Sequence, residues 1–436
     1  MSMRLFTSRG GDRPAIGAIR ARVAIAAIAA IGLMLATPAF AQGTTWVGFP
    51  NADGPSQRVE IDRNFVKEWE SAPPKGFPTL SKQNLAAMAA AIKLYENVVA
   101  KGGFPAVPED QQLNVGMFLP TVALVKQRLA MSADLRESDS DVSQNFDYGL
   151  EKAVKRFQAS NGLSPTGVID KRTMAALNVP AAVRLRQLKV NLQRLTELAR
   201  TAPRKYVVVN IPAAQIEAVD GDKVVSRHSG VVGKPDRQTP ILRSSIHQLN
   251  FNPVWHLPPT VLSQDLVPKG AAMAAKGQDV LAKYGIDALD AQGRKVDTAK
   301  IKWTAATATA YTFQQQPGPE NPLGFVKINF ENSHSVYMHS TPSDTLFGRN
   351  FRAASSGCVR VSGIDQLAAW LVADQGWSHE RVMAMKTSGE RLDVSLKKPV
   401  PLYFAYITAW ATEDGVIQFR RDLYNKDSVG QVAGAY

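Results

Sequence analysis

The sequence predicts an α+β multidomain protein, in which a helical first part precedes a β-rich second part that carries a helical insertion. Apolar residues recur at helical spacing in several segments before residue 200, as at Leu150, Val154 and Phe157. Beyond Pro203 the pattern changes to β-branched runs broken by turn residues. Between residues 258 and 319 the composition becomes helical again, which indicates an insertion into the β-rich domain.

The N-terminus has the three parts of a secretory signal peptide. Five arginines precede an apolar run from Val23 to Ala36, and Ala39 and Ala41 follow at the spacing that signal peptidases read. An uncleaved anchor helix is the alternative, but the run is shorter than the ~20 apolar residues that a membrane span needs. We therefore expect residues 1–41 to be removed on export, with no membrane span in the rest of the chain.

About 395 residues follow the expected signal peptide, which is more than a single domain with one hydrophobic core usually contains. We expect an irregular and helical scaffold segment (42–110), a small helical domain (111–180) and a connector helix (181–203). A β-rich domain (204–390) and C-terminal strands that pack on the scaffold or the β-rich domain (391–436) follow. The helical insertion at about 258–319 lies where a lid over the β-rich domain could be built.

Local signals fix several element ends. Ser81 is the expected N-cap of a helix that Gly102 and Gly103 end. Two dipeptides predict β-hairpin turns, one at Asp220-Gly221 within the β-rich domain and one at Asp414-Gly415 between the last two strands.

The formal net charge is +13, and residues 1–41 hold five arginines and one aspartate of this total, which leaves +9 for the rest. In an exported chain, this excess favours an anionic partner such as a cell-wall polymer or a membrane surface. The simpler alternative is that the charge only keeps the chain in solution. No basic stripe is interleaved with aromatic residues, so we expect no nucleic-acid partner.

Cys358, in "SSGCVRV", is the only cysteine of the chain. A lone cysteine is commonly a small buried hydrophobe. In an exported chain, however, an unpaired cysteine suggests either a reactive thiol or a disulfide to another molecule. The six histidines form no metal-spaced set, and we expect neither a metal site nor a cofactor.

A cysteine nucleophile needs a base within reach, and His339 is the best candidate for that base. It ends the strand-like "SVYMH", where a strand opens into a loop. Cys358 lies nineteen residues later, beyond a polar loop that includes Arg349 and Arg352. That loop can bring the two side chains together.

Two segments resemble known families. "VYMHSTPSDTLFGRNFRAASSGCVRV" resembles the signature of YkuD-type L,D-transpeptidases, and "DYGLEKAVKRFQASNGLSPTGVIDKRTMAALN" resembles a small peptidoglycan-binding domain. Further stretches, such as "VVGKPDRQTPIL" and "LNFNPVWHLPP", look like the larger Gram-negative subfamily. The resemblance covers most of the chain from about Tyr95. It implies a β-rich YkuD-type catalytic domain with a lid, a periplasmic location and peptidoglycan stem peptides as substrate.

The resemblance also implies roles for single residues. Cys358 would attack the carbonyl between the third and fourth residues of a donor tetrapeptide, so that D-Ala leaves and a thioester forms. His339 would take the thiol proton, while the backbone carbonyl of Ser340 holds its imidazole. Backbone amides at Gly357 and Cys358 would form the oxyanion hole, and Arg360 would bind a stem-peptide carboxylate. The diaminopimelate amine of an acceptor stem would then resolve the thioester into a 3→3 crosslink.

Several alternatives stay open at this point. Tyr337 and Ser356 are further substrate-binding candidates, although a core role is the first interpretation of Tyr337 and Trp255 and Arg360 could be part of a structural ion pair. Ser356 stands where members of the family commonly carry histidine. The same fold could instead serve an L,D-carboxypeptidase, a transferase or hydrolase acting on lipoproteins at the wall, or a non-catalytic wall-binding scaffold. Other cell-wall synthesis proteins are conceivable partners.

Overall fold

The computed structural model describes residues 78–135, 143–412 and 414–427. The expected signal peptide and the segment up to residue 77 lie outside these ranges. None of the helices in the described ranges combines the length and apolarity that a bilayer crossing needs.

The helical part contains α2 (Gln83–Ala100), α3 (Pro120–Met131), α4 (Tyr148–Ser160), α5 (Lys171–Leu177) and α6 (Ala181–Thr201). Ser81 accepts the N–H of Asn84 through its hydroxyl, and Gly102 ends α2 in a left-handed conformation. Asp147 and Asp170 cap α4 and α5 through their carboxylates. Helices α3, α4 and α5 enclose a hydrophobic core of their own.

The β-rich domain is built on a nine-stranded sheet in the order β10-β3-β11-β9-β8-β4-β12-β1-β2. Its strands are β1 (Lys205–Asn210), β2 (Gln215–Asp220), β3 (Lys223–Gly233), β4 (Leu242–Phe251), β8 (Val326–Phe330), β9 (Met338–His339), β10 (Ala353–Ser355), β11 (Val359–Val361) and β12 (Leu392–Ala405). Strand β2 also pairs with β3, through the hairpin expected at Asp220-Gly221, so the sheet closes on itself. Because β12 pairs with β1 and β4, the sheet continues past the boundary expected at residue 390.

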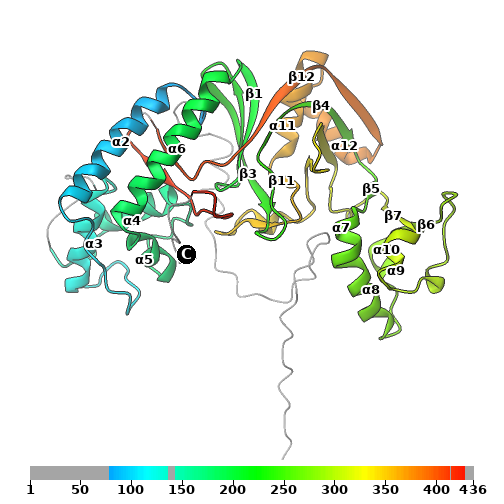
Figure 1. The fold of residues 1–436 in the computed structure, drawn as a ribbon, viewed down its shortest axis with the longest axis horizontal. Coiled ribbons are helices and arrows are strands. Elements are labelled where there is room, and N and C mark those ends of the chain that lie inside the picture. The colour runs from blue at the N-terminus through cyan, green and yellow to red at the C-terminus, as the bar shows by residue number, and fades with distance from the viewer. Residues whose placement is uncertain (1–77, 136–142, 413, 428–436) are drawn as a thin grey trace, which may run out of the picture. The chain divides into compact units, whose positions relative to one another are not determined.

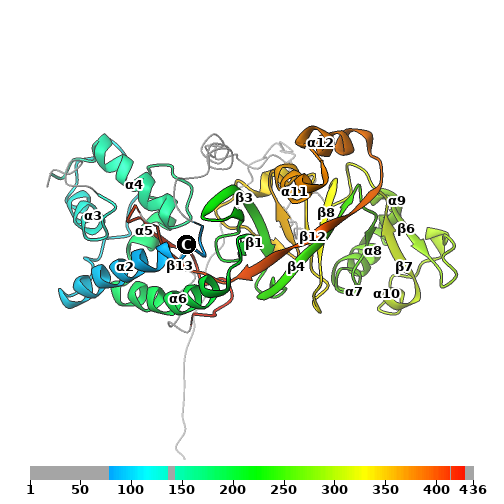
Figure 2. The same ribbon diagram turned by 90° about the horizontal axis from the view of Figure 1, so that it is seen from above.

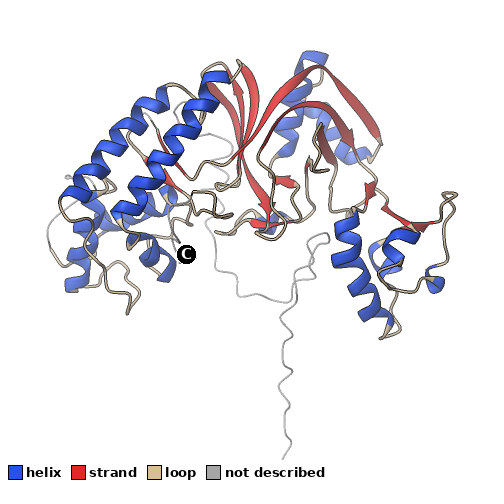
Figure 3. Cartoon of the chain, viewed as in Figure 1, coloured by secondary structure: helices blue, strands red, loops and turns tan. Residues whose placement is uncertain are grey.

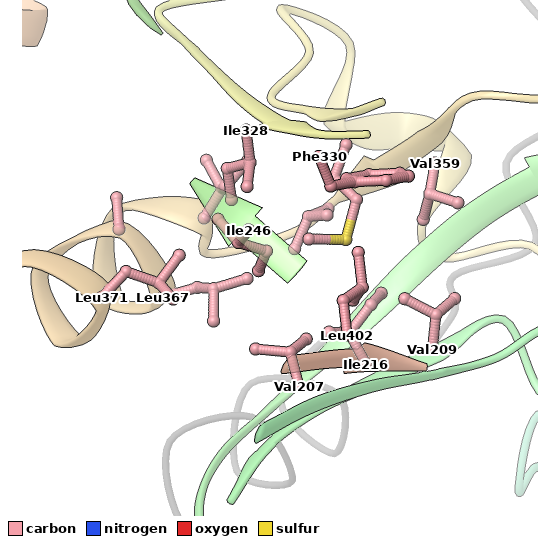
Figure 4. Packing of buried hydrophobic residues seen from close by; sticks show 14 of the residues in the cluster. Val207, Val209, Ile216, Ile246, Ile328, Phe330, Val359, Leu367, Leu371 and Leu402 are labelled. Carbon is pink, nitrogen blue, oxygen red and sulfur yellow. The ribbon is translucent and has the colours of Figure 1, made fainter. Parts of the chain in front are cut away.

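Alternation along β1 divides the packing between two cores. Val207 and Val209 belong to one core with residues of α11 (Ile364–Val372) and α12 (His379–Ser388), which lie side by side in Figure 2. Figure 4 shows this packing around Ile246, Phe330 and Leu402. Tyr206 and Val208 face the second core, which includes residues of α2 and α6.

Helices α2 and α6 lie side by side, as Figure 1 shows, and share the second core with the C-terminal hairpin. The hairpin consists of β13 (Ala409–Ala411) and β14 (Ile417–Phe419), with the turn where Asp414-Gly415 predicted it.

The insertion is only partly helical. It contains α7 (Pro259–Val261), a π-helical turn (Leu262–Leu266), α8 (Val267–Ala274), α9 (Val280–Tyr284) and α10 (Thr307–Ala310). It also contains β6 (Ile286–Leu289) and β7 (Thr312–Gln315), which form a small sheet with β5 (Trp255–His256), just before the insertion (Figure 3). The helical character expected of this segment is present, and the strands could not be predicted because strands of two to four residues are too short to show a period. Short 3-10 segments complete the described chain: Thr298–Lys300, Asp344–Leu346 and Ala373–Gln375.

Candidate active site

Strand register gathers the candidate residues on one face of the sheet. Lys327 on β8 is the register partner of His339 on β9, and His339 is the partner of Arg360 on β11. Their neighbours Ile328, Met338 and Val359 point into the core. Since side chains alternate along a strand, the row Lys327–His339–Arg360 lies on the opposite face.

Tyr337 and Cys358 extend this row by one step. Each precedes a member of the row by two residues, and the backbone carbonyl of Tyr337 accepts the N–H of Val359 at 3.0 Å. The rings of Tyr337 and His339 meet edge to face, with centroids 5.6 Å apart. Two of these residues are cationic, so the half-buried thiol of Cys358 faces a positively charged surface.

Opposing influences act on the Cys358 thiol. Burial raises its pKa, because burial disfavours the thiolate. Hydrogen bonds with the backbone and side chain of Tyr337 lower the pKa, as do the charges of Lys327 and Arg360. The net effect is a raised pKa, so the resting sulfur carries its proton at neutral pH.

His339 is buried and neutral. Burial lowers its pKa to about 3, and the nearby charges of Arg360 and Lys327 act in the same direction. Its Nδ1 lies 2.6 Å from the backbone oxygen of Ser340 and must donate to it, because a carbonyl can only accept. In the neutral ring, Nε2 therefore keeps the lone pair. A proton acceptor in this form is what a protonated thiol requires.

The turn before Cys358 is held by its own hydroxyls. Ser355 donates to the carbonyl of Cys358 at 2.5 Å and accepts the N–H of Gly357 at 3.2 Å. Gly357 has φ of +113°, a conformation that side chains rarely allow. The two amides expected to form the oxyanion hole therefore differ. The N–H of Gly357 is engaged by the hydroxyl of Ser355, whereas Cys358 contacts that hydroxyl through its carbonyl rather than its N–H.

Some of the remaining sequence candidates contact residues of the site, and one braces a loop instead. Ser356 accepts a hydrogen bond from Arg237 at 2.9 Å, and Arg360 is buried beside Cys358, where burial lowers its pKa to about 10. Trp255 is buried in the core of the insertion and hydrogen-bonds the Tyr337 side chain. Arg352 instead donates to the backbone oxygens of Gly230 and Ala213, so it braces the loop.

Sequence reasoning missed Lys327. Its ammonium lies 4.5 Å from the centre of the Tyr337 ring, and its charge acts on both Cys358 and His339. The alternation in "GFVKINF" does place Lys327 on a polar face. Only the pairing of β8 with β9 reveals that this face holds His339. In the described part of the chain, no three His, Cys, Asp or Glu side chains gather in a way that could hold a metal ion.

Comparison with known families assigns both parts of the chain. Residues 204–392 match the model of the L,D-transpeptidase catalytic domain (YkuD), and residues 120–177 match the model described as "Putative peptidoglycan binding domain". The chain therefore carries a YkuD-type L,D-transpeptidase catalytic domain, which follows a peptidoglycan-binding domain. These two domains confirm the predicted resemblance, and the helices and strands of the structure confirm the predicted α+β fold.

A curated protein and several solved structures are similar to parts of this chain. A curated Haemophilus influenzae protein named "Putative L,D-transpeptidase" is 34% identical over 245 residues, which are 55% of this chain and 48% of that protein. The match thus spans about half of that relative's length. Similar solved structures include L,D-transpeptidases of Xylanimonas cellulosilytica (15% identity, 68% of this chain and 98% of that chain, TM-score 0.23) and Stackebrandtia nassauensis (12%, 69% and 97%, TM-score 0.26).

Proposed function

We propose that this protein is a periplasmic, cysteine-dependent L,D-transpeptidase that forms 3→3 crosslinks between peptidoglycan stem peptides. The observation that carries the proposal is the row of Lys327, a neutral His339 and Arg360 on one sheet face, whose two cations also act on the thiol of Cys358. This arrangement suits a thiol that becomes nucleophilic only as its proton leaves.

In the first half-reaction, Nε2 of His339 takes the proton of Cys358 as the sulfur attacks the carbonyl between the third and fourth residues of a donor tetrapeptide. The N–H of Cys358 receives the developing oxyanion, and Gly357 adds a second donor if its N–H turns from Ser355 to the substrate. The C–N bond then breaks, and His339 returns the proton to the amine of the departing D-Ala. A thioester remains on Cys358.

In the second half-reaction, the diaminopimelate amine of an acceptor stem attacks the thioester carbonyl. His339 takes a proton from this amine, the C–S bond breaks, and the proton returns to the sulfur. Arg360, Tyr337 and Ser356 line the reacting carbonyl on the substrate side in this scheme. The insertion at about 258–319 acts as the lid, and the helical domain at 111–180 holds the wall polymer.

Purified protein incubated with disaccharide-tetrapeptide, followed by mass spectrometry, tests the proposal. We expect a tetrapeptide–tripeptide dimer from the wild type and none from Cys358→Ala or His339→Gln. His334→Gln is a matched control, because His334 is an exposed histidine five residues before His339. Tripeptide without dimer would indicate an L,D-carboxypeptidase instead. Equal products from wild type and Cys358→Ala would contradict the mechanism.

A further inference from the structure

We propose that a buried ion pair between Arg237 and Asp265 lets the insertion hold the nucleophile turn, residues 355–358, in the geometry that acylation needs. The two residues are positioning residues, and Ser356 is the point where they act on the turn. This inference rests on the proposed function, since it concerns how Cys358 becomes acylated.

A single guanidinium joins the two parts. Arg237 donates to both carboxylate oxygens of Asp265, through Nη1 at 2.7 Å and Nη2 at 3.1 Å. The same Nη1 donates to the hydroxyl of Ser356 at 2.9 Å. Both charged side chains are about nine-tenths buried, with 9% and 10% of their surfaces exposed. The geometry of a two-point contact fixes the plane of the guanidinium as well as its distance.

Asp265 belongs rigidly to the insertion. It lies in the π-helical turn at Leu262–Leu266, between α7 and α8. Leu262 and Leu266, on either side of it, are buried in the core of the insertion. A π-helical turn adds a residue to the helical turn and is frequently found at functional sites. The backbone that carries the Asp265 carboxylate is therefore a packed part of the insertion.

The backbone next to Arg237 packs directly on the turn. Thr239 donates its hydroxyl proton to the carbonyl of Gly357 at 2.8 Å, and the carbonyl oxygen of Gln238 lies 3.4 Å from where a Cβ at Gly357 would be. The segment 237–239 thus contacts Ser356 through the guanidinium of Arg237 and the Gly357 carbonyl through the hydroxyl of Thr239. A shift of this segment would move the amide groups on which the oxyanion depends.

Stability alone does not explain the pair. Removing two charges from water is costly, and a buried ion pair can be replaced by apolar side chains without loss of stability. Arg237 also buries its Nε without a hydrogen-bond acceptor, which adds to that cost. An apolar pair could fill the same space, but it could not donate to Ser356.

Two variants test the inference. Arg237→Met/Asp265→Leu replaces the whole pair without leaving a lone charge, and Ser356→Ala keeps the pair but removes its acceptor on the turn. Arg204→Gln/Asp220→Asn is the control, because it removes an ion pair with 86% and 45% exposed side chains. Melting temperatures verify that each variant is folded.

Two reactions of the same thiol are then compared by intact mass. A carbapenem acylates Cys358: the sulfur adds to the lactam carbonyl, the C–N bond opens and the nitrogen takes the thiol proton. Iodoacetamide alkylates the sulfur and releases iodide without forming an oxyanion. We expect both test variants to acylate at least about tenfold more slowly than wild type, with alkylation changed by less than about twofold.

Unchanged acylation in folded variants would overturn the inference, and so would an equal fall in both reactions, which would mean damage to the thiol rather than to the turn. If the double variant does not fold, Ser356→Ala decides alone. Acylation of the wild type tests the proposed function, whereas the ratio of variant to wild type tests the role of the ion pair.

Discussion

Two effects oppose each other at the Cys358 sulfur. Burial raises the pKa of the thiol, whereas the charges of Lys327 and Arg360 lower it. His339, its proposed base, is kept neutral by the same burial and the same cations. Both features disfavour a resting thiolate–imidazolium pair. They fit a site in which the proton moves only as the sulfur attacks, and they lead to two predictions at the scale of single residues.

Replacing Lys327 by methionine should raise the pKa of the Cys358 thiol, because the ammonium of Lys327 lowers it. The pH profile of iodoacetamide alkylation should therefore shift to higher pH. Lys327→Arg keeps the charge and should shift the profile much less. An unchanged profile in Lys327→Met would show that this ammonium does not act on the sulfur.

The second residue-scale prediction concerns acid. The pKa of His339 is lowered to about 3, so the competent neutral base persists well below the ordinary histidine value of 6.5. We expect the acylation rate to change less than about twofold between about pH 5 and about pH 7. A fall in rate centred near pH 6.5 would contradict this description of His339.

At the scale of the elements, Gly270 shows how packing can reverse a helix preference. Alanine in place of glycine inside a helix ordinarily stabilises by about 1 kcal/mol. On α8, however, an added Cβ at Gly270 would overlap the ring of Trp303. Overpacking of this kind costs about 1–3 kcal/mol. We expect Gly270→Ala to lower the free energy of unfolding, as measured in urea.

Trp303→Leu provides the control for that measurement. If the overlap is the cause, Gly270→Ala should cost less in the Trp303→Leu background than in the wild type. Equal costs in both backgrounds would place the effect elsewhere.

Elements with strong local signals were predictable and elements defined by pairing were not. The spacing of apolar residues and the residues at the helix ends predict helices α2, α4 and α6, and the Asp-Gly turns predict the two hairpins. The Cys358–His339 pair was suggested by the lone cysteine and by the position of His339 at a strand end, and the family resemblance then assigned the two roles. Lys327 and the Arg237–Asp265 contact depend on strand register and on a turn from a different subdomain. A single sequence does not show which strands pair or which distant segments come into contact.

At the scale of the whole molecule, buried histidines couple stability to pH. The pKa of His228 is lowered to about 4 by burial, and the ring donates from Nδ1 to the carbonyl of Ser362 while Nε2 accepts from Ser226. The unfolded chain takes up this proton below about pH 6.5. The contribution of neutral His228 to the free energy of unfolding is therefore complete above that pH and is lost as the pH falls toward 4. His339 contributes in the same direction.

The difference between urea midpoints at about pH 7 and about pH 5 measures this loss. His228→Gln should show a smaller loss than wild type, because one of the two neutral rings is gone. Asp134, whose pKa burial raises to about 6, opposes the trend equally in both proteins and cancels in the comparison. Identical losses would mean that His228 does not contribute.

The connector helix α6 has a consequence for how a polymer is processed. It is 21 residues long, or about 30 Å, and it packs on α2 and the C-terminal hairpin instead of hanging as a loose linker. Under the proposed function, a glycan strand held by the helical domain would be tethered through α6 to the domain that carries Cys358. Each further stem on that strand would then meet the thiol at a high effective concentration, set by the spacing of the lattice rather than by diffusion from bulk solution.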